Sequence, residues 1–565
     1  MAIIGIDLGT TNSLVSVWCE SAVELIPNAL GEVITPSVIS YDEKSDDLLI
    51  GKAAKQRLIS HPEFSVACFK RAMGTQTEFR LGRKRFNAIE LSALLLKQLK
   101  ADAEAFLNES VNEAVISVPA YFSDTQRNAT KQAGELAGLK VDRLINEPTA
   151  AALAYGLQNK VEQSLFMVID LGGGTLDVSI LDIFDNIIEV RATAGDNFFG
   201  GEDFGLALMD EFARVNDLKV DYLAPLDRAK LATQVEHLKH HLSINHEGEI
   251  DVQISGKSYQ WAITRKEFER IAEPLIKRFR KPIERALRDS QISVSELENV
   301  VMVGGATRMP WVRSEVTKLF QRLPDTRIHP DHVIGLGAGT QAGLKSRDAA
   351  FEELVLTDVC PYTLGVSVAI SVGRSEHESG HFLPLIERNS TVPISREDRL
   401  FTLSDNQSSV LCNIYQGESR LVKNNVKIGS VEVPVPKAKA GEEYVDLRFT
   451  YDVNGILEVI VTVGSNKTSE RTIINHSDST LSEAEIDASF KKLEGIKIHP
   501  RENAKNRELV ARLERYYEES LGDQRKYIAE VLREFDLILA KQDPELAERS
   551  RGRFCEIADY IEQQL

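Results

Sequence analysis

Two stretches of this sequence share residue types that could hold a phosphorylated ligand. Residues 3–18 read IIGIDLGTTNSLVSVW, and residues 166–181 read FMVIDLGGGTLDVSIL. In both, an apolar strand-forming run ends at Asp-Leu-Gly, and a second such run follows after a short break. The pattern predicts a hairpin whose turn glycines let backbone N–H groups approach a ligand, and successive turn amides attract anions.

Acidic and hydroxyl side chains add to both turns. Asp7 and Asp170 end the first apolar runs, where a carboxylate can hold a metal ion that bridges phosphates. Thr10, Thr11 and Thr175 supply hydroxyls. Two such turns, 163 residues apart in the sequence, could hold the phosphates of one nucleotide from opposite sides. A pair of ordinary glycine hairpins is the alternative, but the repeated Asp-Leu-Gly favours a shared role.

The composition indicates a large globular protein. The chain has 565 residues, of which 43% are apolar and 27% charged, so we expect several domains. A net charge of −18 argues against nucleic acid as a partner. The five cysteines contain no CxxC pair, which indicates a reducing compartment and neither a disulfide framework nor a zinc site. Because the sequence shows no signal peptide and no membrane-spanning apolar run, we expect a cytoplasmic protein without a membrane partner.

The sequence pattern changes twice along the chain. Residues 1–348 alternate strand-like runs with helical periods such as residues 90–107, which indicates an α/β domain. Residues 361–478 alternate apolar and polar residues around Asn454-Gly455, a strong hairpin signal, and predict an all-β domain. Residues 479–565 are amphipathic, and the capping-box pattern SEAE at 482–485 predicts the start of a helical bundle. Between them, the linker at 349–360 is unusually apolar, which suggests that it docks on a surface.

Five motifs occur in order along the chain and together resemble the DnaK-type heat-shock-protein-70 chaperones: DLGTTNS, VPAYFSDTQRNAT, INEPTAAALAYG, DLGGGTLDVS and VGGATRMP. The resemblance extends through LTDVCPYTLG and DNQSSVLCNIYQGE, and so covers nearly the whole chain. It implies an actin-like (ribonuclease H-like) two-lobed ATPase domain at 1–348 and an interdomain linker at 349–360. It further implies a β-sandwich substrate-binding domain at 361–478 and a shortened helical lid at 479–565.

The resemblance also implies which residues bind ATP or ADP. Two phosphate loops would be formed by Asp7, Gly9, Thr10, Thr11 and Asn12 and by Asp170, Gly172, Gly173, Gly174 and Thr175. The remaining nucleotide-binding residues would be Gly200, Gly201, Glu236, Lys239, Ser243, Gly304, Gly305 and Arg308. Catalysis of ATP hydrolysis would fall to Lys70, Glu147, Asp170 and Thr175. Asp7 and Asp170 would act on Mg²⁺ mostly through its waters, and Asp177 fits the family's alkali-ion (K⁺) site more loosely.

Two other patterns could indicate ligand sites, and we reject both. His237, His240 and His241 include an i, i+4 pair on one helix face, but no third metal ligand is evident. GLGAG at 335–339 resembles a dinucleotide fingerprint, but no strand precedes it.

In the family, hydrolysis is coupled to the peptide-binding domain through a relay and the linker. Pro119 and Arg127 match the relay, and Leu354, Val355, Leu356 and Asp358 match the docking residues of the linker. Thr357 stands where a third leucine is usual, so we expect weaker docking, by roughly 1–2 kcal/mol if that site is buried. An edge strand is the plainer interpretation of this stretch.

The peptide groove and the partners follow from the same resemblance. Phe401 and Val410 align with groove residues, and Leu403 or Ser404 lies near an arch over the peptide, although core packing would also explain Phe401 and Val410. Ala369 replaces a bulky methionine, which would open that arch. The expected partners are unfolded or extended polypeptides and a J-domain cochaperone, for which Tyr121, Asp124 and Arg143 match the family positions. Shortened segments in the ATPase domain leave the use of a nucleotide-exchange factor open.

We therefore predict an ATP-dependent molecular chaperone. The alternatives are a small-molecule kinase or a filament-forming ATPase on the same fold, or a binding module with an inactive ATPase. The second domain, lid and apolar linker disfavour the kinase, and the complete catalytic set disfavours the inactive module.

Overall fold

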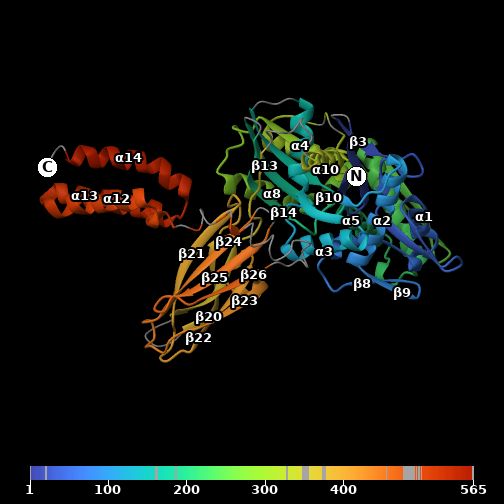
Figure 1. Cartoon of the computed structure of the whole chain (residues 1–565). Helices are drawn as coiled ribbons and strands as arrows, with labels where there is room; N and C mark the ends of the chain where they lie inside the picture. The colour runs from blue at the N-terminus through green and yellow to red at the C-terminus, as the bar shows by residue number, and fades with distance from the viewer. Residues whose placement is uncertain are drawn as a thin grey trace. The chain divides into compact units, whose positions relative to one another are not determined.

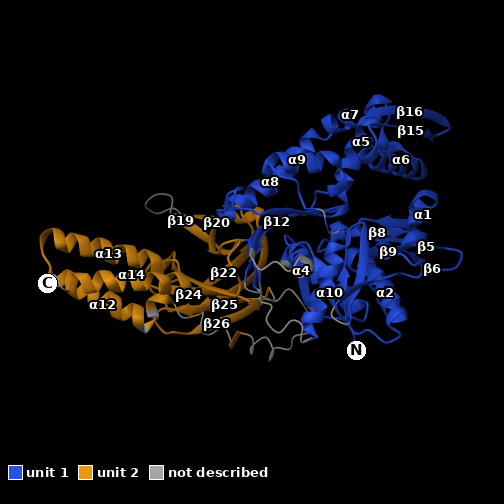
Figure 2. Ribbon diagram, turned by 90° about the horizontal axis from the view of Figure 1, so that it is seen from above, with its two compact units in different colours: residues 1–362, 476–480 blue, residues 363–475, 481–565 orange. Residues whose placement is uncertain are grey.

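The computed structural model describes residues 2–19, 22–159, 163–184, 187–325, 327, 329–346, 355–371, 377–452, 455–474, 490–491, 493, 497 and 499–562. The chain forms two compact units (Figures 1 and 2). Unit 1 holds residues 1–362, and unit 2 holds residues 363–475 and the C-terminal helices. No helix in the described part of the chain is long and apolar enough to cross a membrane.

Unit 1 is built around two sheets of the same plan, each a three-stranded antiparallel meander with a parallel strand beside its first strand. The first sheet has the order β11-β10-β1-β2-β3, from β1 (Ile3–Asp7), β2 (Asn12–Cys19), β3 (Ala22–Ile26), β10 (Glu113–Val118) and β11 (Lys140–Asn146). The second has the order β17-β12-β13-β14-β18, from β12 (Gln163–Leu171), β13 (Leu176–Phe184), β14 (Ile187–Asp196), β17 (Asn299–Val303) and β18 (Val355–Thr357). The two Asp-Leu-Gly stretches are the equivalent hairpins β1–β2 and β12–β13, as the repeated sequence predicts.

Helices and smaller sheets surround this framework and confirm the mixed α/β content. The helices are α1 (Lys52–Ser60), α2 (Ala88–Leu107), α3 (Asp124–Leu136), α4 (Glu147–Asn159), α5 (Gly201–Val215), α6 (Pro225–Ile244), α7 (Arg265–Ile271), α8 (Glu273–Ser290), α9 (Pro310–Phe320) and α10 (Val333–Lys345). The smaller strands are β4 (Thr35–Pro36), β5 (Val38–Asp42), β6 (Asp47–Ile50), β7 (Ser65–Ala67), β8 (Glu78–Leu81), β9 (Lys84–Asn87), β15 (Glu247–Ile254) and β16 (Lys257–Thr264). Capping boxes begin α2 at Asn87 and α3 at Ser123, where each cap accepts a backbone N–H that would otherwise lack a partner.

Two helices, α4 and α10, share a buried core with both large sheets. That core combines Val115 and Ile145 of the first sheet with Phe166 and Val168 of the second. Within α10, a Cβ on Gly337 would lie 1.8 Å from the carbonyl oxygen of Ala150 on α4. The glycines of GLGAG therefore let two helices approach closely, and the rejection of a dinucleotide fingerprint is confirmed because the stretch lies inside a helix.

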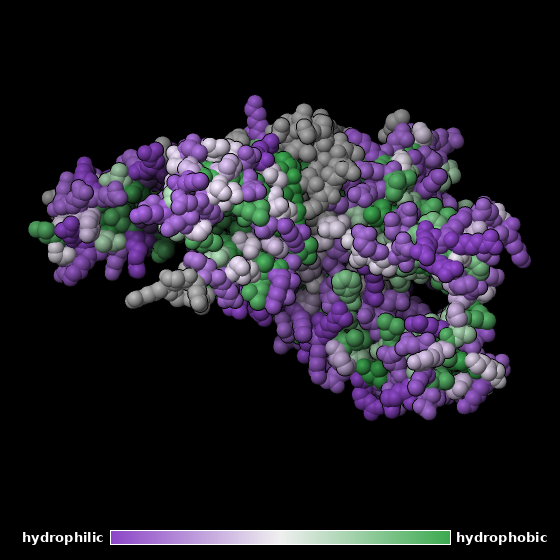
Figure 3. Space-filling model, turned by 90° about the horizontal axis from the view of Figure 1, so that it is seen from below, coloured by the Kyte–Doolittle hydropathy of each residue, from purple (hydrophilic) through white to green (hydrophobic). Residues whose placement is uncertain are grey.

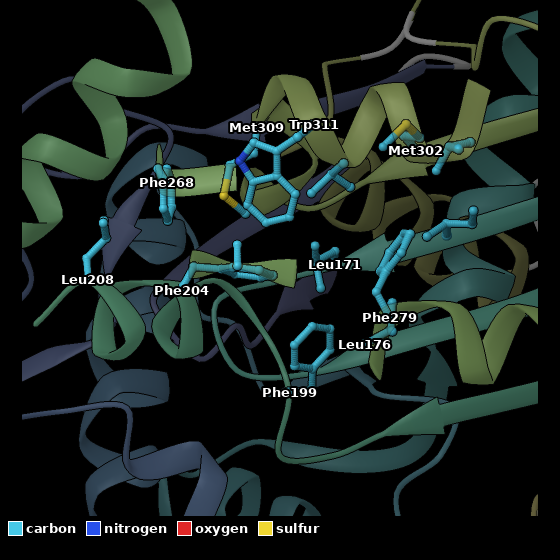
Figure 4. Close-up of a cluster of buried hydrophobic side chains, with 14 of the residues drawn as sticks. Leu171, Leu176, Phe199, Phe204, Leu208, Phe268, Phe279, Met302, Met309 and Trp311 are labelled. Atoms are coloured by element: carbon cyan, nitrogen blue, oxygen red, sulfur yellow. The ribbon is translucent and has the colours of Figure 1, made fainter. Parts of the chain in front are cut away.

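An aromatic cluster fixes α5 against the second sheet. Phe204 of α5 lies between Phe199 and Trp311, with ring centroids 5.6 Å and 4.6 Å away (Figure 4). Leu171 and Leu176, which flank the second hairpin loop, belong to the same core. The start of α5 is thereby held beside that loop.

Unit 2 contains two four-stranded antiparallel sheets and a helical bundle. The sheets have the orders β20-β19-β22-β23 and β21-β24-β25-β26, from β19 (Leu364–Ser371), β20 (His377–Ile386), β21 (Ile394–Phe401), β22 (Ser409–Gln416), β23 (Val426–Pro434), β24 (Tyr444–Tyr451), β25 (Leu457–Val463) and β26 (Ser469–Ile474). Val445, Leu447 and Phe449 are fully buried, so the predicted alternation and all-β character are confirmed. Asn454 of the predicted turn lies outside the described residues.

The C-terminal helices are α12 (Ala504–Glu519), α13 (Gly522–Ala540) and α14 (Pro544–Glu562). Their apolar faces form one core, in which the rings of Phe535 and Phe554 lie 4.9 Å apart. The predicted helical bundle is confirmed for residues 504–562. The predicted capping box at 482–485 lies outside the described residues.

The packing of α4 on α10 generates a stability prediction. Gly337→Ala should lower the free energy of unfolding by about 3 kcal/mol, because its Cβ would overlap the backbone of Ala150. Gly335→Ala is the matched control, since its Cβ would meet Leu14 Cβ at an ordinary 3.4 Å, and it should raise helix stability by up to ~1 kcal/mol. Thermal or denaturant unfolding of the two variants measures both effects, and equal stabilities would contradict this packing.

Candidate functional site

The two Asp-Leu-Gly loops contact each other directly. A Cβ on Gly173 would lie 2.3 Å from Thr11 Cγ2, and one on Gly174 would lie 2.7 Å from Thr10 Cγ2. Glycine is therefore required where the second loop meets the threonines of the first. Figure 3 shows the surface of unit 1 hollowed between two arms.

A cavity beside these loops is lined by residues from both hairpins and from the elements around them. Thirteen predicted site residues line it: Asp7, Gly9, Thr10, Thr11, Asn12, Lys70, Glu147, Asp170, Gly172, Gly173, Thr175, Gly304 and Gly305. Of the predicted nucleotide-binding residues, Gly174, Gly200, Gly201, Glu236, Lys239, Ser243 and Arg308 are not part of this lining. Most predicted residues of the two hairpin loops therefore line this cavity, whereas Glu236, Lys239, Ser243 and Arg308 do not.

A buried ion pair is part of the lining of this cavity. Lys70 Nζ donates to Glu147 Oε1 at 2.9 Å, and both side chains are buried. Lys70 belongs to the 3₁₀ turn η2 (Phe69–Ala72), and Glu147 begins α4. Two segments distant in sequence therefore place opposite charges together in a buried site.

Three further carboxylates lie close to this pair. Burial, and then the charge of Glu147, raise the pKa of Asp7 to about 7 and the pKa of Asp177 to about 7. Burial followed by Glu147 also raises the pKa of Asp170 well above its ordinary value. Ser117 Oγ donates to Asp7 Oδ1 at 3.0 Å, and the backbone N–H of Tyr121 donates to Asp177 Oδ1 at 3.0 Å.

This donor set fits a hard cation bound partly through other ligands. Carboxylate oxygens suit Mg²⁺ and K⁺, and their mutual repulsion is relieved by positive charge. Among the described residues, the buried Asp177 Oδ2 has no hydrogen-bond partner, and no three acidic, histidine or cysteine side chains converge enough to hold a metal ion alone. Mg²⁺ commonly retains several waters and uses only one or two carboxylates. Such a cation fits a site with an unpartnered carboxylate oxygen and without three converging protein ligands among the described residues.

The second loop is supported by backbone contacts and by an arginine that sequence reasoning missed. The N–H groups of Gly201 and Glu202 donate to the carbonyls of Gly172 and Gly173, both at 2.9 Å. Arg71 donates to the carbonyl of Gly174 at 3.2 Å and to Asp203 at 2.7 Å. Its position next to Lys70 was the available signal.

The predicted Gly304 also approaches this loop closely, whereas a Cβ on Gly305 would meet Asp331 Oδ1 at 3.0 Å. Gly304 has φ +84°, and a Cβ there would lie 2.4 Å from the carbonyl of Leu171. Glycine tolerates the positive φ at that position, and it has no Cβ to overlap the carbonyl.

The predicted far-side residues form their own network. Lys239 Nζ donates to the carbonyl of Gly201 at 2.9 Å and pairs with Glu236 at 2.7 Å. Ser243 Oγ donates to the carbonyl of Lys239 within α6, so its hydroxyl is used by the helix. Arg308 pairs with Asp331, which lines the cavity, and contacts His329 Nε2 at 3.0 Å.

The cavity also has apolar walls that no motif indicated. Leu14, Ile34, Val303, Pro330 and Ile334 line it together with Asp331. Leu14 and Val303 belong to strands, so their alternation could identify burial but not a cavity. His237 and His241 remain exposed side chains of α6 without a metal cluster among the described residues.

The linker residues that the structure describes pack with unit 1. β18 pairs in parallel with β14, and Thr357 lies opposite Glu189. Asp358 Oδ2 accepts from Asn146 Nδ2 at 2.5 Å, and Arg127 donates to Asn146 Oδ1 at 2.6 Å. Leu354 lies outside the described residues, and only the backbone is described for Val355 and Leu356. Residues 355–357 thus form an edge strand of the second sheet, and their role in docking stays a prediction.

Asn146 was missed, although it directly precedes Glu147 and links the linker to that residue's helix. Pro119 lies between β10 and Tyr121, and Arg127 also donates to the carbonyl of Ala120 at 3.0 Å. Tyr121 is buried, and its role toward a J-domain partner stays a prediction. Arg143 faces Asp358, and the side chain of Asp124 lies outside the described residues.

The predicted groove residues of unit 2 are not part of its core. Phe401 is 55% exposed and Leu403 45% exposed, which removes core packing as an explanation for Phe401. Ser404 is exposed, whereas Val410 and Ala369 are half-buried. An exposed Phe and Leu near the end of β21 present apolar surface to solvent.

Comparison with known proteins agrees with this architecture. The family described as Hsp70 protein matches residues 3–81 and 75–536. The Chaperone protein DnaK of Thermotoga neapolitana is 40% identical over 503 residues, which cover 86% of this chain and 82% of that protein. The Chaperone protein DnaK of Thermosipho melanesiensis is 38% identical over 526 residues, covering 90% of this chain and 85% of that protein.

The site and the comparisons together define a nucleotide-binding class of chaperone. The chain belongs to the Hsp70 family. It is an ATP-dependent molecular chaperone and an ATPase, and the comparisons do not favour a kinase or a filament-forming ATPase.

The carboxylate cluster predicts a pH-dependent response to Mg²⁺. Asp7 and Asp177 have a pKa of about 7 in the folded chain, above the ordinary value of 3.8. Between these values the folded state holds protons that the unfolded state has released. Stability without a cation should therefore fall as the pH rises through this window and level off above it.

Because Mg²⁺ competes with those protons, it should raise the thermal midpoint more at about pH 8 than at about pH 5.5. Thermal unfolding with MgCl₂ or an ionic-strength-matched tetramethylammonium salt measures this. An equal Mg²⁺ effect at both pH values would show that the cluster does not bind the cation.

Proposed function

We propose that unit 1 is an actin-like ATPase domain of two lobes, each built on one of the two large sheets. The loops after β1 and β12 would hold the phosphates of ATP or ADP through Gly9, Thr10, Thr11 and Asn12 and through Gly172, Gly173, Gly174 and Thr175. The observation that carries this proposal is the direct contact of the two loops at Gly173 and Thr11, next to a cluster of cation-seeking carboxylates.

The proposed chemistry is hydrolysis by attack of water on the γ-phosphate. Glu147 and Thr175, together with Asp170, would orient the attacking water, and Lys70 would neutralise charge that develops on the phosphate. The Lys70–Glu147 pair supports this assignment because it fixes both groups before substrate binds. Mg²⁺ held near Asp7 and Asp170 would supply further charge neutralisation, and Asp177 is the proposed K⁺ ligand.

The remaining predicted nucleotide contacts stay proposals. Glu236, Lys239 and Ser243 on α6, with Gly304, Gly305 and Arg308, would bind the adenine and ribose. Gly200 and Gly201 would contribute to nucleotide binding indirectly, because the N–H of Gly201 already donates to the second loop at Gly172.

Unit 2 would be a β-sandwich that binds extended apolar segments of unfolded proteins, with the C-terminal helices as a short lid. The exposed side chains of Phe401 and Leu403 support this, with Ser404 and Val410 as further groove residues. Release of the segment would follow ATP-driven docking of the linker through Val355, Leu356 and Asp358, with Leu354 as a further anchor. Pro119 and Arg127 would relay the nucleotide state.

The proposed domain bounds are 1–348, 349–360, 361–478 and 479–565. A J-domain cochaperone and unfolded polypeptides are the proposed partners, and the cytoplasm is the proposed location. Within the Hsp70 family, the motifs suggest a place in the HscC branch.

Asp358 offers the sharpest test of coupling. Asp358→Asn should weaken the contact with Asn146 and remove the charge that faces Arg127 and Arg143. Basal hydrolysis should stay within about twofold of wild type, whereas ATP-induced release of a fluorescent apolar peptide should slow about tenfold, as loss of one charge-assisted contact predicts. Asp398→Asn, at an exposed carboxylate of unit 2, is the matched control. Unchanged peptide release in Asp358→Asn would refute linker coupling through this residue.

A further inference from the structure

Tyr362 contacts the catalytic half of unit 1 from just beyond the linker. Its hydroxyl donates to the backbone carbonyl of Tyr121 at 2.6 Å. The two tyrosine rings also lie 4.5 Å apart with an interplanar angle of 42°. Burial raises the pKa of Tyr362, so the hydroxyl keeps its proton and remains a donor.

The backbone of Tyr121 reaches from Tyr362 to the carboxylate cluster. Its N–H donates to Asp177 Oδ1 at 3.0 Å, and its carbonyl also accepts from Asn197 Nδ2 at 2.7 Å. Its own hydroxyl accepts from Arg285 at 2.8 Å, with that guanidinium 5.7 Å from the ring centroid. Tyr121 is therefore held on several sides. The hydrogen bond from Tyr362 fixes the carbonyl of Tyr121, and the N–H of the same residue binds Asp177.

We propose that Tyr362 is a positioning residue, a second anchor that ties the docked linker to Asp177 through the main chain of Tyr121. This inference rests on the proposed coupling function and deepens it. Asp358 provides the first anchor through Asn146, next to Glu147. Tyr362 provides an independent one, and the two anchors enclose the short segment that follows β18.

The short β18 strand and the buried hydroxyl of Thr357 explain why docking of the linker needs a second anchor. β18 has only three residues, and among the described residues its buried Thr357 Oγ1 has no hydrogen-bond partner. A buried hydroxyl without a partner opposes docking. The ring contact and hydroxyl of Tyr362 offset that weakness with interactions made only when the segment lies on unit 1.

The test uses the full chain and the conservative variant Tyr362→Phe, which keeps the ring and removes the hydroxyl. With ATP bound, hydrogen exchange at the amides of residues 355–357 should become about three- to tenfold faster. ATP-induced release of a fluorescent apolar peptide should slow by a similar factor, whereas the thermal midpoint with ADP should not change. Tyr222→Phe, at an 86% exposed tyrosine of unit 1, is the matched control and should behave as wild type.

A second variant tests the compensation. Thr357→Val removes the buried hydroxyl at constant shape, and combined with Tyr362→Phe it should restore slow exchange at residues 355–357. If Tyr362→Phe matches wild type in exchange and release, the anchor role is overturned while linker coupling stands. If wild type itself shows no difference between ATP and ADP in either readout, the proposed function fails and this inference fails with it.

Discussion

Four acidic side chains and one lysine share a single buried site, and the rest of unit 1 is arranged around that imbalance of charge. Lys70 pairs with Glu147, while Asp7, Asp170 and Asp177 keep raised pKa values because burial and mutual repulsion disfavour their ionised forms. A site of this kind is stable only with further positive charge or with protons. The residues themselves therefore favour an added positive charge, such as a cation, at this site.

The fold makes this cluster possible by using the same hairpin twice. Each sheet delivers one aspartate to the end of a strand, and the glycines at 173 and 174 let the two loops meet at Thr10 and Thr11. Close packing of α4 on α10 through Gly337 holds the helix that begins at Glu147, and Glu147 lines the same cavity as the two loops. The linker then reaches this centre by two hydrogen-bonded routes, one through Asn146 and one through Tyr121.

Much of this was predictable from the sequence because the signals are local. The repeated Asp-Leu-Gly hairpins, the all-β alternation at Val445 and the helical tail follow from periodicity and turn chemistry. The role of the two hairpin loops in phosphate binding stays a prediction. Arg71, Asn146 and Asp331 could not be predicted in this way, because their roles depend on partners at 203, 358 and 308. The contact between Tyr121 and Tyr362 likewise joins residues that are far apart in sequence.

The most direct measurement is single-turnover ATP hydrolysis by Lys70→Ala, with ATP affinity measured on the same protein. If Lys70 pairs with Glu147 and neutralises charge that develops on the γ-phosphate, hydrolysis should fall about 10²–10³-fold while ATP binding changes less than about tenfold. Lys55→Ala, at an exposed position of α1, should leave both unchanged. Hydrolysis by Lys70→Ala at the wild-type rate would contradict the account.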